Sequence, residues 1–488
     1  MVDAAGLRYV RRARGAPLSF STKLYQGIGA IPDTVKNWVF NTFTLLFYNQ
    51  ILGMDAALVS VALAIAIVCD ALADPLVATF SDNSKSRWGR RHPLMLLASL
   101  PLGAALFAVF VPPSGLSHTG LFIWLLTFTV LTRGLMALYF VPWAAIAAEL
   151  SDDYHERTSV MSYRFAVGWT IGVGFPLFVF TYLMPATAEY PVGQLNPAAY
   201  AKMAFLAGCL LTGGALATTL LTWREIPFLR QHAGAGAGAA FGFKQSAREI
   251  MQALRNRQFA LVFLIVLLSS AIGGTTANVG IYMTTYFWGL TTEDLRWFAL
   301  SAIGALLAFP LVAAVQRKLD KKHILLACSI TSLIEGLALV NLRFLDVLPA
   351  NGDTKLLVIL VSGGAFAASI GVIQGIIGAS IIADLLDDQE LRTGYRQEAM
   401  FNAALSFAGK AVSGIGTLIG GLIITLIDFP TNVAPAAVPA DAIRRLGLVV
   451  GVAVPLLYIV PISLITRYRL TRARHAEIQA ALQARRAQ

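Results

Sequence analysis

Twelve long apolar stretches constrain this 488-residue chain more than any other feature. A helix needs about 20 apolar residues to cross the hydrocarbon core of a bilayer, and the stretches have that length. Hydrophobic residues make up 57% of the chain and charged residues 13%, against about 25% charged residues in a soluble domain. The sequence therefore predicts an all-α membrane protein with twelve transmembrane helices, near 23–48, 55–81, 94–112, 119–149, 158–184, 201–223, 258–289, 297–316, 323–344, 355–383, 397–428 and 443–467.

The positive charge of the chain, a net +11, is concentrated in short connections between these stretches. Clusters of Lys and Arg precede the first span, follow the second and the last, and fill the middle connection, whereas 111–120 and 185–200 contain neither residue. Cytoplasmic loops carry the excess of Lys and Arg, so we expect both termini in the cytoplasm and an even number of spans. The charge therefore indicates topology in a bacterial-type cytoplasmic (inner) membrane, and no nucleic-acid partner.

The two halves of the chain repeat each other at an offset of 235 residues. Residues 148–158 (AELSDDYHERT) align without gaps on 383–393 (ADLLDDQELRT), and six of the eleven positions are identical. Parallel repeats of six spans are the architecture of major facilitator transporters, which hold substrate at the midplane between the halves. We therefore expect two pseudo-symmetric six-helix bundles at 1–223 and 258–467, a cytoplasmic linker at 224–257 with a short amphipathic helix at 244–257, and a basic cytoplasmic tail at 468–488.

Two aspartates, Asp70 and Asp74, lie inside the second apolar stretch. A charged side chain at the centre of a membrane helix costs about 2.5–3.5 kcal/mol on insertion scales. The i, i+4 spacing places both on one helix face, where two like charges should share a cation or a proton. The repeat carries them onto Ala305 and Phe309, so the pair belongs to one half only. The sequence therefore predicts a cation-binding site, with a structural salt bridge as the alternative.

Basic residues inside other spans are candidates to act with this pair. Lys410 lies about twelve residues into span eleven among small residues, and we expect it to hold the two acids when no cation is bound; snorkelling to the interface is the alternative. Arg133 in span four and Arg164 in span five are expected to bind an anionic or hydroxyl-rich substrate, or else to pair with an acid. Asp33 and Lys36, three residues apart, are expected to neutralise each other.

Polar and aromatic side chains within the spans supply further substrate-binding candidates. Asn278 and Tyr282 share one face of span seven and offer hydrogen bonds to hydroxyls; aromatic packing is the alternative. Trp143, which follows a proline in span four, is expected either to stack on a sugar face or to pack. The remaining candidates of this kind are Gln374, Asn37 and Asn41.

Charged residues of both signs cluster in loops at equivalent places in the two halves. We expect such loops to latch the halves together when the cavity faces outward and to part when it faces inward; topological marking by positive charge is the alternative. The gating candidates are Asp82, Arg87, Arg90, Arg91, Glu149, Arg157, Asp384 and Arg392.

These motifs resemble the glycoside–pentoside–hexuronide:cation symporters, the major facilitator branch that contains melibiose permease. The similarity covers nearly the whole chain, and its most specific part is DALADP at 70–75 with SRWGRRHP at 86–93. It continues at ERT (156–158) and YRQE (395–398). The resemblance implies twelve helices and alternating access, with Asp70 and Asp74 as the coupling-cation site, Lys410 as its basic partner and Arg164 beside the sugar cavity.

The chain departs from the family pattern at four positions. Ala73 stands where asparagine precedes the second acid, and Ala137 replaces a hydroxyl ligand on helix four. Sodium needs several hard oxygens, so these losses favour proton over sodium coupling, with Na⁺ at the two aspartates as the alternative. The family's acidic galactoside ligands fall at Thr34 and Phe140, which argues against a melibiose-like substrate. The vertebrate lysolipid carriers also resemble this family, and a more apolar cavity suits an amphiphile.

We therefore expect a cation-coupled symporter that imports a glycoside, pentoside or uronide by alternating access; a lysophospholipid or other amphiphile is the alternative substrate. The sequence has no HExxH or GxSxG motif, so we expect no enzyme, no catalytic residues and no cofactor besides the coupling H⁺ or Na⁺. A sensor or a lipid-moving protein without ion coupling is the third functional class. The expected partners are the bilayer and a small-molecule substrate, and the expected assembly is a monomer.

Overall fold

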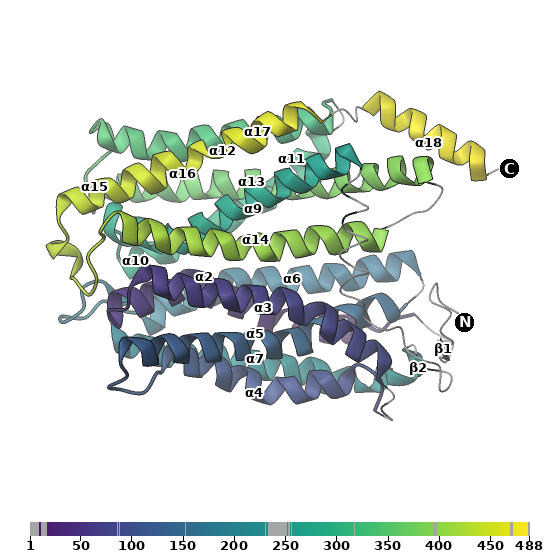
Figure 1. Cartoon of the computed structure of the whole chain (residues 1–488), viewed down its shortest axis with the longest axis horizontal. Helices are drawn as coiled ribbons and strands as arrows, with labels where there is room; N and C mark the ends of the chain where they lie inside the picture. The colour runs from purple at the N-terminus through teal and green to yellow at the C-terminus, as the bar shows by residue number, and fades with distance from the viewer. Residues whose placement is uncertain are drawn as a thin grey trace. The chain divides into compact units, whose positions relative to one another are not determined.

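The computed structural model describes residues 9–10, 17–84, 86, 88–151, 153–229, 231–232, 251, 254, 256–316, 318–393, 398–468 and 472–486. The chain divides into two compact units, Met1–Phe241 and Gly242–Gln488, which are described separately. Both are built from long helices, as Figure 1 shows.

The first unit contains the first six spans. The first span is divided into α1 (Phe20–Ile28), α2 (Ile31–Leu46) and a π-helical turn, η1 (Phe47–Ile51). Helix α4 packs against α5 and α7, α3 against α5, and α1 against α6. Strands β1 (Tyr9–Val10) and β2 (Gln231–His232) pair antiparallel. The other elements are α3 (Ala56–Asn83), α4 (His92–Phe110), α5 (His118–Glu149), α6 (Tyr154–Phe178), η2 (Val179–Leu183), η3 (Gly193–Leu195), α7 (Pro197–Leu221) and η4 (Trp223–Phe228).

The second unit contains the other six spans and the C-terminal helix. In it α9 packs against α14, and α13 packs against both α11 and α12. Its elements are α9 (Arg257–Tyr282), η5 (Met283–Phe287), α10 (Thr292–Leu295), η6 (Arg296–Leu300), α11 (Ser301–Val315), α12 (Lys321–Phe344), α13 (Thr354–Thr393), α14 (Glu398–Leu426), η7 (Pro435–Ala437), α15 (Ala440–Leu448), η8 (Val449–Ala453), α16 (Val454–Leu456), α17 (Ile459–Thr466) and α18 (Arg472–Arg486).

Ten helices in the described part of the chain are long and apolar enough to cross a membrane. The first predicted span is not among these ten. It is broken between α1 and α2, and α2 with η1 carries two charged residues and several amide side chains. The eleventh is α14, whose apolar stretch is described over Gly414–Leu426. With these two, the helices occupy all twelve predicted positions and confirm the all-α membrane fold.

The internal repeat appears in the backbone at the ends of the first and seventh spans. Each span closes with a five-residue π-helical turn, η1 and η5, followed by a glycine with positive φ, Gly53 and Gly289. The hydrogen bonds match as well, with Met54 N donating to Tyr48 O and Leu290 N to Thr284 O. Glycine adopts positive φ without strain, so each half uses the same device to turn the chain out of its first helix.

The first span bends at Gly29, and two aromatic side chains of α5 stabilise the bend. The indole Nε1 of Trp143 donates to Gln26 O at 3.0 Å, and the Tyr139 hydroxyl donates to Gly29 O at 3.1 Å. Both carbonyls lie where the helix is interrupted, so they need donors from a neighbouring helix. A Cβ at Gly29 would collide with the Trp143 ring, which explains why glycine stands there.

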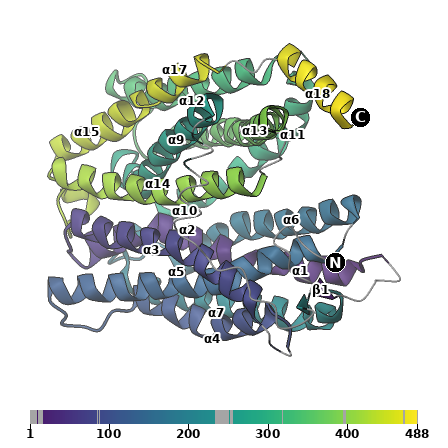
Figure 2. The same ribbon diagram turned by 45° about the vertical axis from the view of Figure 1, so that its right-hand side comes forward.

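The connection and the tail that flank the second unit are described in part. The amphipathic helix predicted at 244–257 falls mostly outside the described residues. The tail forms α18, which lies beside the end of α13 in both Figure 1 and Figure 2. Its Ile478 and Leu482 are buried, and Gln479 donates to Asp387 of α13 at 2.6 Å.

Candidate functional site

Asp70 lies on α3 and pairs with a basic residue of the neighbouring helix α5. It is buried, and its Oδ2 lies 3.4 Å from Nη1 of Arg133. The guanidinium of Arg133 also lies over the Phe40 ring of α2, 5.4 Å from the ring centroid. Of the two roles predicted for Arg133, the geometry therefore matches pairing with an acid rather than lining a substrate cavity.

Asp74 follows one turn later on α3, and Pro75 follows Asp74 directly. A proline has no backbone N–H, so it cannot donate to the carbonyl of Ala71, four residues earlier. The helix thus presents a backbone carbonyl oxygen between its two carboxylates. Hard oxygens of this kind are the ligands that alkali and alkaline-earth cations prefer. Lys410 lies on α14, and its side chain is outside the described residues.

A cavity of about 590 Å³ is lined by residues of the first unit alone. Arg164 of α6 lies on its wall with its guanidinium 3.6 Å from the centre of the Trp143 ring, a cation–π contact. Trp143 is held in place on both sides, because its carbonyl also accepts from Nε2 of Gln26 at 2.9 Å. The structure therefore brings together two of the predicted substrate-binding residues, Arg164 and Trp143, on a rigid support.

The wall of this cavity is largely apolar and aromatic. Thr34 and Arg164 supply its hydroxyl and its charge, while the indole N–H of Trp143 is already bonded within the unit. The positions where the family has acidic sugar ligands, Thr34 and Phe140, both lie on the wall. The complete lining is Ala30, Thr34, Phe140, Trp143, Met161, Arg164, Phe165, Gly168, Trp169, Gly172 and Val173.

Four of the predicted gating residues form one ionic cluster within the first unit. Glu149, at the end of α5, accepts from both Arg90 and Arg91, the latter at 2.5 Å. Asp82, at the end of α3, lies 3.4 Å from Arg90 and 3.3 Å from Arg91. Glu149 and the two arginines are buried, so this cluster fixes the ends of α3 and α5 to the start of α4. Arg87 lies outside the described residues.

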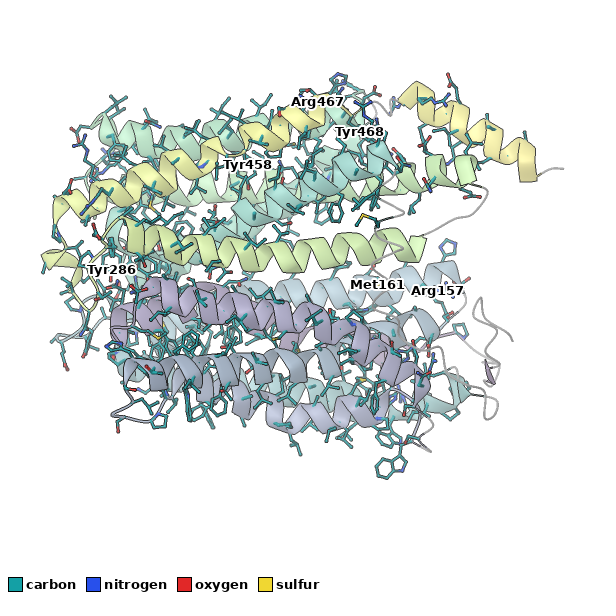
Figure 3. All side chains as sticks on the ribbon, viewed as in Figure 1. Arg157, Met161, Tyr286, Tyr458, Arg467 and Tyr468 are labelled. Carbon is teal, nitrogen blue, oxygen red and sulfur yellow. The ribbon has the colours of Figure 1, made fainter. Side chains whose placement is uncertain are left out.

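A smaller cluster occupies the equivalent place in the second unit. Asp384 of α13, which aligns with Glu149, lies 2.6 Å from Lys321 at the start of α12 and 3.3 Å from His475 of α18. His475 also lies 3.2 Å from Asp387. The side chain of Arg392 is outside the described residues. Arg157, on the exposed side of α6, donates from Nε to the carbonyl of Ser151 at 2.7 Å (Figure 3).

The other substrate-binding candidates are placed apart from the first cavity. Asn278 donates to Thr417 of α14 at 3.0 Å, and Tyr282 is fully buried against Phe429 in the turn after α14, so both join α9 to the α14 region within the second unit. Gln374 donates to Ser329 at 3.3 Å on the wall of a separate cavity. Asn37 and Asn41 are exposed on α2 in the first unit. Asp33 and Lys36 form the predicted ion pair, at 3.2 Å.

Sequence reasoning missed several residues that organise these sites. Tyr139 and Gln26 support the bend in the first span, and Lys321 and His475 complete the Asp384 cluster. The alignment of Glu149 on Asp384 was a usable signal for Lys321, because a buried carboxylate in both halves requires a cation in both. Tyr139 and Gln26 could not be found in this way, because a single sequence does not show which side chains will hydrogen-bond to the backbone of a bent helix.

Comparison with known proteins gives the same fold. The xylose transporter XylE from E. coli, in an inward-open conformation, superposes with a TM-score of 0.56 at 13% identity, over 94% of this chain and 97% of that one. At this identity the likeness shows the fold alone. It confirms the major facilitator architecture that the repeat predicted.

Three relatives align along almost their whole length. An uncharacterized symporter of Synechocystis sp. is 26% identical over 96% of this chain and 97% of its own. The putative glycoside/cation symporter YagG of Escherichia coli is 22% identical, covering 94% of this chain and 93% of its own. The sphingosine-1-phosphate transporter MFSD2B of Xenopus tropicalis is 26% identical, covering 97% and 92%.

The profile of one protein family matches residues 25–472, which is nearly the whole chain. That range holds both six-helix units, the paired aspartates and the Arg164 cavity, so the match and the geometry concern the same part of the molecule. The chain belongs to the MFS/sugar transport protein family, and it is a multi-pass membrane transporter of the major facilitator superfamily.

Proposed function

We propose that the chain is a cation-coupled symporter in which Asp70 and Asp74 bind the coupling cation and the Arg164 cavity binds the substrate. The observation that carries the proposal is the connection between the two sites through α5. Arg133, which pairs with Asp70, and Trp143, which supports Arg164, lie on this one helix. Ten residues separate them, about 15 Å at 1.5 Å per residue. A change in the charge of Asp70 therefore acts on the helix that forms part of the substrate wall.

A proton is the coupling ion that this arrangement favours. The carboxylate of Asp70 already faces a guanidinium, so protonation of the acids removes the attraction to Arg133 and frees α3 from α5. Sodium would need more oxygen ligands than two carboxylates and one carbonyl, and Ala73 and Ala137 offer none from their side chains. By linkage, the proton and the substrate then raise each other's affinity by the same factor.

The cavity wall favours an anionic amphiphile as the substrate. Arg164 supplies a charge-assisted hydrogen bond to an acidic head group, and Phe140, Phe165 and Trp169 offer apolar surface to the rest of the molecule. A sugar needs many hydrogen-bonding partners, and this wall offers few polar side chains, namely Thr34, Arg164 and the indole N–H of Trp169. One relative is named for sphingosine-1-phosphate, a molecule of this chemical class.

A glycoside is the second candidate substrate class. Indole rings stack on the apolar face of a pyranose, and the wall contains Trp143 and Trp169. The name of the relative YagG points the same way.

We further propose that the transporter works as a monomer in a cytoplasmic membrane with both termini inside. The basic clusters before the first span, in the middle connection and after the last span support this orientation, because the connections 111–120 and 185–200 contain no Lys or Arg.

Uptake into proteoliposomes tests the coupling site. An imposed proton gradient should drive accumulation of sphingosine-1-phosphate by the unaltered protein, and the double variant Asp70→Asn/Asp74→Asn should lose that accumulation. Asp55→Asn is the matched control, because Asp55 caps the start of the same helix and asparagine caps equally well. Accumulation that survives the double substitution, or that a sodium gradient alone drives, would contradict proton coupling at this pair.

The substrate class is tested at Arg164. Replacing its guanidinium in Arg164→Gln should raise the KM for sphingosine-1-phosphate at least about tenfold, since a charge-assisted hydrogen bond contributes about 1.5–3 kcal/mol. Counterflow of a neutral alkyl glucoside should change much less. If instead the glucoside is exchanged and the anionic amphiphile is not, the cavity serves the second candidate class.

A further inference from the structure

A second cavity, of about 360 Å³, lies inside the second unit among α9, α12, α13 and α17. Its size falls within the range of small-molecule sites, about 300–1,000 Å³. Most of the wall is aliphatic. Figure 3 labels two of its tyrosines, Tyr458 just before α17 and Tyr468 just after it. The polar members of the lining are Ser269, Ser270, Lys322, Ser329, Gln374, Tyr458 and Tyr468.

The internal repeat explains why this cavity exists. At the offset of 235 residues, Tyr139 and Trp143 of α5 align with Gln374 and Gly378 of α13. In the first unit the two aromatic rings fill the space beside the bent first helix, with Tyr139 0% and Trp143 2% exposed. In the second unit a Cβ added at Gly378 meets no atom within 4 Å. The second cavity therefore lies where the aligned positions of the first unit carry the large rings of Tyr139 and Trp143.

The cavity presents hydrogen-bonding groups that nothing in the described part of the unit satisfies. The hydroxyl of Tyr468, a residue 3% exposed, is buried without a partner there. Buried polar groups are almost always paired in native proteins, so an orphaned hydroxyl on a cavity wall points to a missing ligand or water. Gln374, on the same lining, uses its amide N–H on Ser329, which leaves its amide oxygen as an acceptor.

The two ends of the cavity differ in charge. Lys322 carries the formal charge of the described lining, and its Nζ donates to Thr466 O at 2.7 Å with further N–H groups to spare. Burial, with Asp384 and Asp388 nearby, raises the pKa of Tyr468, so its hydroxyl stays a donor. The charge of Asp384 is compensated by Lys321. Lys322 and the Tyr468 hydroxyl therefore offer an acid group a cation and a donor, although Asp388 also lies near this end, and the Gln374 end offers an acceptor to a hydrogen-bond donor.

We propose that this cavity binds a medium-chain hydroxy acid. The carboxylate lies at Lys322 and Tyr468, the chain follows the aliphatic wall, and the hydroxyl donates to the amide oxygen of Gln374. The length follows from α12, where seven residues separate Lys322 from Ser329, the partner of Gln374, or about 10 Å. The site lies wholly within the second unit and shares no lining residue with the Arg164 cavity.

Saturation binding of radiolabelled ω-hydroxydecanoate to the full chain in lipid nanodiscs tests this site. The unaltered protein should bind it saturably, and empty nanodiscs give the background from lipid. Decanoate lacks the hydroxyl and decanediol lacks the acid, so each should compete at least about fivefold more weakly, as expected for one lost hydrogen bond of about 1 kcal/mol. Equal competition by decanoate would overturn the assignment of the Gln374 end.

Four substitutions locate the binding. In the Arg164→Gln background, where the first cavity has lost its charge for an anionic probe, Gly378→Leu fills the second cavity and should abolish saturable binding. Gly371→Leu in the same background, on the same helix and outside the lining, should leave it unchanged. Tyr468→Phe should weaken binding about fivefold without loss of stability, because the hydroxyl it removes has no partner among the described residues. Arg164→Gln should bind normally. Saturable binding that survives Gly378→Leu, or none in the unaltered protein, would overturn the proposal whatever is found for transport.

Discussion

The two units share the same arrangement of helices and differ in the side chains that occupy equivalent interior positions. In the first, Tyr139 and Trp143 fill the space between α1 and α5 and bond to the carbonyls of a bent helix. In the second, Gln374 and Gly378 stand at the aligned positions, and a cavity remains. The same backbone framework thus carries two large aromatic rings at these positions in one half and smaller side chains beside a cavity in the other. A helical repeat fixes the scaffold and leaves the interior side chains free to diverge.

The ionic clusters at the helix ends show a second difference between the units. Glu149 serves two buried arginines, whose side chains are 6% and 8% exposed. Asp384 serves Lys321, whose side chain is 32% exposed. A buried charge that loses its partner has no water to replace it, whereas an exposed one has. The carboxylate at this aligned position should therefore contribute more to the free energy of unfolding in the first unit than in the second.

The largest effect is expected from the Glu149 cluster. Glu149→Gln leaves the two buried guanidiniums with the half-exposed Asp82 in place of their buried counter-charge, and it should lower the free energy of unfolding by about 3–5 kcal/mol. Asp384→Asn should cost about 1 kcal/mol, since Lys321 reaches water. Chemical denaturation in mixed micelles measures both. Equal losses for the two variants would break the comparison.

The next effect on the free energy of unfolding concerns Trp143 and Gly378, which occupy aligned positions in the two units. Trp143→Ala removes a buried ring and a hydrogen bond, and it should lower the free energy of unfolding by about 3–4 kcal/mol. Gly378→Leu should instead raise it by about 1 kcal/mol, because leucine is a better helix former than glycine and enters open space. The same denaturation assay applies. Destabilisation by Gly378→Leu would show that the hollow is not available to a side chain.

The smallest effect concerns a pair that only the first unit contains. A double-mutant cycle of Asp70→Asn and Arg133→Gln should give a coupling energy of about 1 kcal/mol, as expected for two groups in contact. The aligned positions of the second unit are Ala305 and Ala368, so the matched cycle with serine at both should be additive. Additivity in the first unit would mean that the contact between Asp70 and Arg133 contributes nothing.

Much of the fold follows from the sequence because bilayer thickness and charge placement act on every span. The spans, the repeat and the Asp33–Lys36 ion pair could all be predicted from the sequence. The site was readable only where a residue type is costly in lipid, as for Asp70 and Arg164. The partner of Asp70 was not, because a sequence shows that Arg133 and Lys410 each lie deep in a span without showing which helices touch. The filled and hollow interiors likewise depend on three-dimensional packing.

The short strands of the first unit have a consequence for how such a chain arose. Tyr9 and Val10 pair with His232 and Gln231, so the chain enters this bundle and leaves it at the same place. A bundle whose entrance and exit meet can be copied and joined head to tail without rerouting any helix. Duplication of one six-helix ancestor then yields the full chain in a single genetic step, and each copy is afterwards free to lose or gain its own contents.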